Sequence, residues 1–255
     1  MNSEQKGNSL AQFTIHIRVK NTNRIMKEKL LIVGTSHTAR SIYSYVKDYD
    51  LYNLLGFVVD KEYKTIDRYC DKPVFTFDNL PSEFDKEKDF LFIAIEWDRL
   101  NAVRKKVYLR LKNEGYRLAN IISPHAMIHG NILGDNCWIT DGVIIENDVT
   151  IYEDVMIKSR ATIQHLSTIE PHCFVGANSL LAGHVHLGEQ TYVGISATIF
   201  DAVNVGKKCL IGACTYVKRH IPDCSVIKTK NDEFVMKQYG EDEIENKLLT
   251  SISIR

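Results

Sequence analysis

Residues 161–187 read ATIQHLSTIEPHCFVGANSLLAGHVHL, and a branched aliphatic side chain stands at every sixth position of this stretch. The spacing continues in both directions without a slip, from residue 133 to residue 217. Helices and flat strands have shorter periods, so neither requires this pattern. A chain that turns a corner every six residues does, because each flat face of a triangular coil then contributes one inward side chain. The fifteen positions are Leu133, Ile139, Ile145, Ile151, Ile157, Ile163, Ile169, Val175, Leu181, Leu187, Val193, Ile199, Val205, Ile211 and Val217.

Small or apolar side chains also recur two residues before these positions, as a cramped corner would select. Repeats of this kind are typical of solenoids, which bury a continuous core by stacking successive coils. The segment contains no long insertion, so we expect coils of about 18 residues, roughly five in number, beginning near Met127. The corner set is Cys137, Val143, Val149, Val155, Ala161, Ser167, Cys173, Ser179, Val185, Thr191, Ala197, Val203, Cys209 and Thr215.

The segment before the repeat predicts a small parallel α/β sheet. Helices are expected from Thr38 to Val46 and between the N-cap candidate Asp98 and the terminator Gly115. Continuous apolar strands alternating with helices favour a sheet that is buried on both faces. We therefore predict an α/β Rossmann-like domain at 26–122 and a solenoid domain at 123–226. The apolar runs that predict strands are 29–33, 54–59, 90–95 and 118–122.

The two ends of the chain carry no repeat. Residues 1–25 are polar and mixed, and we expect a disordered tail there rather than a signal peptide. The period fails after Pro222, and the charged segment from Asn231 to Leu249 predicts a helix, so 227–255 is expected to be a helical extension.

The bulk composition excludes several classes of partner. The 32 basic and 32 acidic side chains cancel, so no net field attracts nucleic acid or a membrane surface. No apolar run reaches about 18 residues, the length that a membrane span requires. Three of the six cysteines fall on the corner set, and Cys70, Cys214 and Cys224 form no CxxC pair. We expect reduced structural cysteines and a cytoplasmic protein.

Residues 30–40, LLIVGTSHTAR, form a strand, a turn at Gly34 and the start of a helix. Backbone N–H groups at such a turn favour a phosphate, and a tight structural turn is the alternative. Asp60 ends the second strand, where an acidic residue often reaches a ribose or base. A solvated aspartate at the strand end is the alternative reading there.

Four histidines lie close together in the repeat. With the inward aliphatic as zero, His172 and His184 sit at plus three and His186 sits at minus one, so the three are not expected to converge on a metal. His165 lies two residues past an inward aliphatic, on an edge of the coil. A single histidine acting as general base is the stronger idea, because its ordinary pKa lies near neutrality. A surface histidine without a role is the alternative.

With these features the sequence resembles bacterial sugar acyltransferases of the hexapeptide-repeat, left-handed β-helix type. The subgroup includes sialic acid O-acetyltransferases and N-acetyltransferases that act on nucleotide-linked 4-amino-4,6-dideoxysugars. The likeness runs from Lys29 to about Val226. It includes the turn at 34–40, the strand end at 56–60, the segments 92–95 and 104–108, and the whole repeat.

The resemblance implies roles for particular residues. His165 falls on the family's basic histidine, and Gly183 falls where a backbone N–H lies near the thioester oxygen. The acyl-CoA would lie along the solenoid, between two subunits of a homotrimer, while the N-terminal domain holds the nucleotide sugar. The implied CoA positions are Ile195 and Ala213 beside the arm and Lys218 and Arg219 near the phosphates. The implied sugar-nucleotide positions are Gly34, Thr35, Ser36, His37, Val59, Asp60 and Glu96.

Some residues depart from the family pattern. Members usually carry Asp or Glu directly after the histidine, whereas Gln164 and Leu166 flank His165 here. Its orientation then requires another carboxylate, a backbone carbonyl or a neighbouring subunit. Phe174 replaces a histidine near the CoA, and the histidine of the phosphate turn is displaced by one residue, to His37. Glu96 and Trp97 replace a Gly-Asn pair, and the following loop is three residues longer.

The predicted function is an acetyl-CoA-dependent sugar N-acetyltransferase of glycan or lipopolysaccharide biosynthesis, without a metal. An amine acceptor needs a base less acutely than a hydroxyl, so the missing neighbouring carboxylate favours N-acylation. O-acetylation of a sugar of the sialic acid type is one alternative. A trimer that binds a nucleotide sugar without turnover is another.

Overall fold

The computed structural model describes residues 27–95, 97–230 and 233–245. The predicted tail at 1–25, the site candidate Glu96 and the last part of the predicted C-terminal helix lie outside the described residues. Within the described parts of the chain, no helix has both the length and the apolar character needed to span a bilayer.

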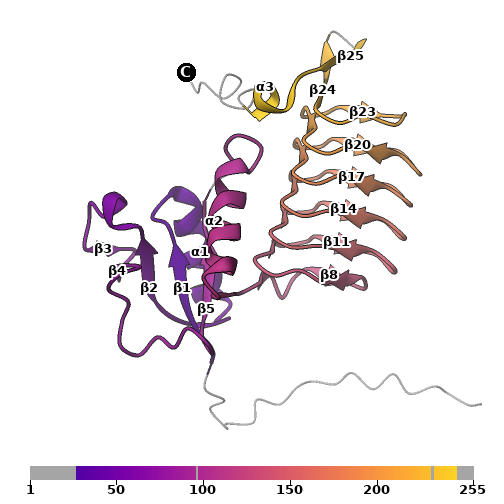
Figure 1. Cartoon of the computed structure of the whole chain (residues 1–255). Coiled ribbons are helices and arrows are strands. Elements are labelled where there is room, and N and C mark those ends of the chain that lie inside the picture. The colour runs from indigo at the N-terminus through magenta and orange to yellow at the C-terminus, as the bar shows by residue number, and fades with distance from the viewer. Residues whose placement is uncertain (1–26, 96, 231–232, 246–255) are drawn as a thin grey trace, which may run out of the picture.

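A small α/β region precedes the repeat (Figure 1). Its sheet has the order β3-β4-β2-β1-β5-β6, with β3 antiparallel to β4 and the other pairs parallel. The strands are β1 (Lys29–Val33), β2 (Asn53–Val59), β3 (Arg68–Tyr69), β4 (Lys72–Thr76), β5 (Phe90–Ile93) and β6 (Arg117–Leu118). The helices are α1 (His37–Asp48), the 3-10 helix η1 (Lys61–Tyr63) and α2 (Ala102–Asn113).

The start of α2 differs from the sequence-based expectation. Asn101, not Asp98, is the N-cap residue. Arg99, Leu100 and Asn101 all have positive φ angles, between 49° and 63°, so the chain cannot enter a right-handed helix before residue 102. The amide Nδ2 of Asn101 donates to the carbonyl of His172 at 2.7 Å, which ties this loop to the solenoid.

The repeat forms a three-sided parallel β-solenoid, as the period of six predicts. Between residues 138 and 217, strand partners are 18 residues apart, as in Ile139 with Ile157, so each inward aliphatic side chain stacks on the one in the next coil. Face 1 consists of β7 (Ile121–Ile122), β10 (Trp138–Ile139), β13 (Met156–Ile157), β16 (Phe174–Val175), β19 (Tyr192–Val193) and β22 (Leu210–Ile211). Face 2 consists of β8 (Met127–Ile128), β11 (Ile144–Ile145), β14 (Thr162–Ile163), β17 (Leu180–Leu181), β20 (Thr198–Ile199) and β23 (Tyr216–Val217). Face 3 consists of β9 (Asn131–Ile132), β12 (Thr150–Ile151), β15 (Thr168–Ile169), β18 (His186–Leu187) and β21 (Asn204–Val205).

The inward positions from Ile139 to Val217 are fully buried in one core, as predicted. Leu133 is the exception, with 66% of its surface exposed. Ile132, not Leu133, pairs with Ile151 and packs against the core. One extra residue separates β9 from β10, and this shifts the inward position back by one.

The solenoid also begins earlier than predicted. Ile121 and Ile122 pair with Trp138 and Ile139, so β7 belongs to the first coil rather than to the α/β region. The corner cysteines Cys137, Cys173 and Cys209 are buried free thiols, as expected. Their burial raises the pKa of Cys137 and of Cys209 to about 12.

The C-terminal segment is not the predicted helix. β24 (Ser225–Lys230) adds to face 1 beside β22, and β25 (Glu233–Gln238) pairs with it in an antiparallel hairpin. Only α3 (Glu241–Glu245) is helical in the described part, and its Ile244 is buried against Leu100 and Cys224. An open strand edge at β22 offers backbone partners that the charge pattern of this segment does not reveal.

Aromatic side chains on the outer side of face 1 join the solenoid to the α/β region. Trp138 and Phe174 share one apolar cluster with α1 and the central strands. Phe174 stacks on Tyr192 with ring centroids 4.7 Å apart, and Trp97 packs on Phe174 at 5.0 Å. Phe174 therefore contributes to the contact between the two parts of the chain.

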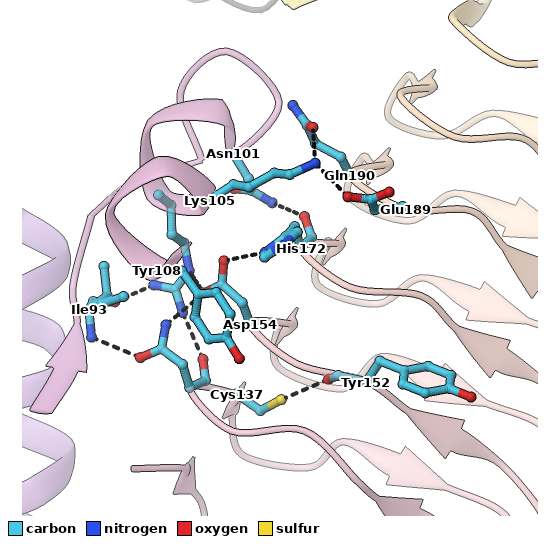
Figure 2. A network of polar contacts seen from close by, with 12 residues as sticks. Ile93, Asn101, Lys105, Tyr108, Cys137, Tyr152, Asp154, His172, Glu189 and Gln190 are labelled. Carbon is cyan, nitrogen blue, oxygen red and sulfur yellow. Dashed lines mark hydrogen bonds and ion pairs between the residues drawn. The ribbon is translucent and has the colours of Figure 1, made fainter. Parts of the chain in front are cut away.

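A buried ion pair fixes the same junction (Figure 2). Arg104 of α2 lies 2.6 Å from the Asp154 carboxylate, and both side chains are completely buried. The second oxygen of Asp154 lies 2.8 Å from His172 Nδ1. Arg104 also donates to the carbonyl oxygens of Ile93 and Asn136. Burial lowers the pKa of Arg104, and the Asp154 charge opposes that change.

Asn136 completes the link between β5 and the coils. Its side-chain oxygen accepts from the Ile93 amide at 2.9 Å, and its nitrogen donates to Asp154 at 2.6 Å. The end of β5 is therefore held from two sides by the solenoid, in addition to its place in the sheet.

We predict that Asp154→Ala lowers the free energy of unfolding by about 3–5 kcal/mol, because it leaves the buried guanidinium of Arg104 without a counter-charge. Urea titration followed by circular dichroism measures the change. Asp67→Ala is the matched control, since the carboxylate of Asp67 is paired with Lys64 on the surface and its loss should matter little. Equal stability of both variants would contradict the assignment.

Candidate functional site

Three turns lie one above another at the corner between faces 2 and 3. Two of them contain His165 and Gly183, the main residues that the sequence predicted for the site. His165, Gly183 and Asp201 follow β14, β17 and β20 at intervals of 18 residues. Backbone hydrogen bonds join the turns, from His184 N–H to the His165 carbonyl and from Ala202 N–H to the Gly183 carbonyl, both at 2.9 Å. The coil thus places these three residues one above another on the outside of the solenoid.

The orientation of His165 comes from a carboxylate that sequence reasoning missed. Glu146 lies 19 residues earlier, in the coil below, and its Oε2 accepts from the His165 backbone N–H at 3.0 Å. The same oxygen lies 3.3 Å from Nδ1 of the ring. The side chain of His165 is 52% exposed, so this contact leaves about half of it accessible. Folding the sequence onto its own 18-residue coil places Glu146 below this corner, and that signal could have found it.

Gly183 lies directly against the other side of the imidazole. A Cβ atom at Gly183 would come within 2.7 Å of both Cε1 and Nε2 of His165, so only glycine leaves room for the ring in this position. His184 packs edge-on against the same ring, with centroids 5.6 Å apart. Nδ1 of His165 therefore faces Glu146, and Nε2 faces Gly183.

The amide of Gly183 already has a partner. Its N–H donates to Oδ1 of Asp201 at 3.0 Å, from the coil above. The N–H therefore points toward the coil above, where a carboxylate oxygen occupies it in this structure.

The four residues expected near CoA divide between two corners. Lys218 and Arg219 lie at the His165 corner, with the Lys218 ammonium 5.4 Å from the ring centroid of Phe200. Ile195 and Ala213 are exposed at the corner between faces 1 and 2, one above the other. Face 2 separates the two pairs within one chain.

The turn between β1 and α1 has the geometry expected of an anion-binding loop. Gly34 has φ +105°, which glycine tolerates best, and Thr35 follows it. Ser36 caps α1 by accepting from the Ala39 N–H at 3.3 Å, and it donates to the Ala94 carbonyl at 3.0 Å. His37 is exposed at the first position of α1. The first turn of α1 carries no acidic residue, so nothing opposes the positive end of the helix dipole.

The other sugar-nucleotide candidates differ in their surroundings. Asp60 accepts from Arg110 of α2 at 2.7 Å, so it is ion-paired rather than simply solvated. Val59 is buried in the core of the α/β region, and its side chain cannot reach a ligand there. The polar candidates that remain at this edge of the sheet are the turn at 34–37 and the Asp60–Arg110 pair.

The neighbouring histidines take separate partners. His172 contacts the buried Asp154, and His186 lies 3.1 Å from Glu170 on face 3. Among the residues that the structure describes, no group of three or more His, Cys, Asp or Glu side chains is placed to hold a metal ion.

Comparison with known proteins supports the repeat and the fold. No family model matches the chain. The acyl-[acyl-carrier-protein]–UDP-N-acetylglucosamine O-acyltransferase of Stutzerimonas stutzeri is 29% identical over 98 residues, which is 36% of this chain and 38% of that one. Its counterpart in Campylobacter concisus is 27% identical over 133 residues, 49% of each chain. This chain therefore spans less than half the length of the curated relatives it matches.

Solved structures match both parts of the chain. Perosamine N-acetyltransferase from Caulobacter crescentus, in a variant bound to CoA and GDP-perosamine, superposes with a TM-score of 0.72 at 23% identity, over 83% of this chain and 97% of that one. The acetyltransferase domain of PglB from Neisseria gonorrhoeae superposes with a TM-score of 0.70 at 18% identity, over 83% and 100%. WeeI from Acinetobacter baumannii gives 0.68 at 15% identity, over 82% and 100%. The α/β region followed by the solenoid is thus a shared fold.

We predict that Gly183→Ala moves the His165 ring without unfolding the solenoid. The added methyl group would overlap Nε2 and Cε1, which lie at the far end of a side chain that can rotate. A crystal structure of the variant should show a changed His165 rotamer and an unchanged backbone. Gly240→Ala is the control, because nothing lies within 4 Å of that position. An unmoved ring in Gly183→Ala would refute the packing described above.

Proposed function

We propose that this chain, which its repeat and fold place among the hexapeptide-repeat acyltransferases, transfers an acetyl group from acetyl-CoA to the amino group of a nucleotide-linked amino-deoxysugar. The proposal rests on the surroundings of the His165 ring. Its Nδ1 lies against the Glu146 carboxylate, and its Nε2 lies against Gly183.

This arrangement suits a general base. If the Nδ1–H donates to Glu146, then Nε2 carries the lone pair and faces the space outside Gly183. The carboxylate would also stabilise the imidazolium that forms when Nε2 accepts a proton. Glu146 thereby replaces the carboxylate that family members carry next to their histidine.

The proposed reaction is attack of the acceptor nitrogen on the thioester carbonyl carbon. His165 Nε2 takes a proton from the nitrogen as the C–N bond forms, and the imidazolium returns it to the CoA sulfur as the C–S bond breaks. The Gly183 N–H is the proposed donor to the carbonyl oxygen as it becomes negative.

We propose that acetyl-CoA lies in a cleft between two copies of a homotrimer. Ile195 and Ala213 would line its arm, and Lys218 and Arg219 would meet its phosphates. Within one chain, face 2 lies between these two pairs, so a single ligand could use both only where the corner of one copy meets the other corner of a second. Solved relatives contain CoA or acetyl-CoA, which supports this donor.

The α/β region is the proposed Rossmann-like site for the nucleotide sugar. Gly34, Thr35, Ser36 and His37, at the start of α1, would bind its phosphates through backbone N–H groups. Asp60 and Glu96 are proposed to lie around the nucleotide. The structural relative that holds GDP-perosamine supports an amino sugar as the acceptor.

O-acylation is the second candidate, because the curated relatives are O-acyltransferases of a UDP-linked sugar. Both candidates use CoA- or carrier-linked acyl donors and nucleotide sugars, so we propose a cytoplasmic role in glycan or lipopolysaccharide biosynthesis. A trimer that binds without turnover is the third.

One assay separates the three candidates. The protein is mixed with acetyl-CoA and a panel of UDP-, dTDP- and GDP-linked sugars that carry either an amine or a hydroxyl at the acceptor carbon, and thiol release is followed. Turnover with the amines supports N-acetylation, and turnover with only the hydroxyls supports O-acetylation. Calorimetric binding of a nucleotide sugar without any turnover would favour the non-catalytic trimer.

We predict that His165→Asn lowers kcat by about 10²-fold or more and leaves the assembly intact, because the reaction loses its base. Steady-state kinetics and size-exclusion chromatography provide the measurements. Normal kcat in this variant would remove His165 from the mechanism.

We also predict that Glu146→Gln lowers kcat by about tenfold, because the imidazolium loses a charged partner while the shape of the side chain is kept. Glu170→Gln is the matched control, since it alters an equivalent carboxylate–histidine contact at His186. Equal kcat in the two variants would show that Glu146 has no part in the reaction.

A further inference from the structure

A second carboxylate lies at the His165 corner, and the proposed reaction gives it no role. Asp201 is exposed, sits one coil above Gly183 and holds the Gly183 N–H at 3.0 Å. Its carboxylate therefore occupies the N–H group that the proposed reaction needs as a hydrogen-bond donor to the thioester oxygen.

Two hydrogen-bond acceptors, one on His165 and one on Asp201, thus contact Gly183 from different sides. The Nε2 of His165 lies against the position that a Gly183 side chain would take, and Asp201 Oδ1 lies at the Gly183 nitrogen. Glu146 is engaged with the far side of the imidazole. A substrate amine that contacts both Nε2 and Asp201 would therefore have to lie against Gly183.

We propose that Asp201 determines the preference for an amine over a hydroxyl acceptor, an inference that rests on the function proposed above. A neutral primary amine has two N–H bonds and one lone pair. It can donate one hydrogen to His165 Nε2 and the other to Asp201, which leaves the lone pair free for the thioester carbon. A hydroxyl has a single hydrogen, so one of its oxygen lone pairs would face a carboxylate with no hydrogen bond between them.

The contact between the amine and Asp201 also controls whether the Gly183 N–H is available as the oxyanion donor. When an amine draws the Asp201 carboxylate away, the Gly183 N–H becomes free to donate a hydrogen bond to the thioester oxygen. Without an amine, Asp201 keeps the N–H occupied, so bound acetyl-CoA is not activated toward water. The acceptor itself therefore completes the site.

The protons balance in this scheme. An acceptor that arrives as an ammonium pairs with Asp201 and releases one proton to water. The resulting amine attacks the carbonyl carbon, a second proton passes to His165 Nε2, and the imidazolium gives that proton to the departing CoA sulfur. The products are an N-acetylated sugar, CoA thiol and one proton.

The experiment compares Asp201→Asn and Asp201→Ala with the wild-type protein. The acceptors are GDP-perosamine and its hydroxyl counterpart, GDP-rhamnose, and acetyl-CoA hydrolysis is followed without either. We expect the ratio of kcat/KM for amine over hydroxyl to fall by about tenfold or more in both variants, because one charged hydrogen bond to the amine is lost. Hydrolysis without acceptor should rise several-fold in Asp201→Ala, where the N–H is free.

Asp223→Asn is the matched control, because Asp223 also accepts from a corner amide, Lys207 N–H, at 3.0 Å. An acceptor ratio and a hydrolysis rate that stay at wild-type values in the Asp201 variants, as in this control, would overturn the proposal while leaving the proposed function intact. If the wild-type protein acetylates neither sugar, the binding of acetyl-CoA by calorimetry still decides. Tighter binding of acetyl-CoA to Asp201→Ala than to Asp223→Ala supports the view that Asp201 occupies the Gly183 N–H. Equal binding of acetyl-CoA to the two variants refutes it.

Discussion

The stacking of buried aliphatic side chains at intervals of 18 residues is the constraint on which the rest of this structure depends. Because Ile139 lies under Ile157, and Ile157 under Val175, every corner residue also lies under the residue 18 positions later. Residues that are one coil apart in the sequence therefore become fixed neighbours along the axis of the solenoid. His165, Gly183 and Asp201 are stacked for this reason, and Glu146, which is 19 residues before His165, reaches that histidine from the coil below.

In this cluster of four residues, the position of one side chain is set by residues of the adjacent coils. A ring nitrogen is oriented from the coil below, and room for the ring is provided by a missing side chain in the coil above. The carboxylate beside His165 thus comes from another coil and not from a sequence neighbour. The adjacent Leu166 is an exposed apolar side chain.

Much of the fold could be predicted because its information is local and periodic. The inward positions from Ile139 onward, the corner cysteines, the strands β1, β2 and β5 and the two long helices before the repeat follow from short patterns, whereas β3 and β4 were not predicted. What failed depends on long-range pairing. Leu133 is exposed because one inserted residue shifts the register, and the segment at 233–238 is a strand because β24 offers it an edge. Within the candidate site, His165 and Gly183 were predicted from the resemblance to a family, whereas Glu146 and Asp201 contact them across coils and carry no signal in the sequence next to them.

The buried guanidinium at the junction has a mechanical consequence. Arg104 of α2 reaches the last carbonyl of β5, the Asn136 carbonyl and the Asp154 carboxylate at once. Any rigid-body rotation of the sheet about the solenoid would strand a positive charge away from water, at a cost of several kcal/mol. Rotation of the α/β region about the solenoid is therefore disfavoured. A ligand that contacted both the edge of the sheet and the coils would meet them in one fixed arrangement.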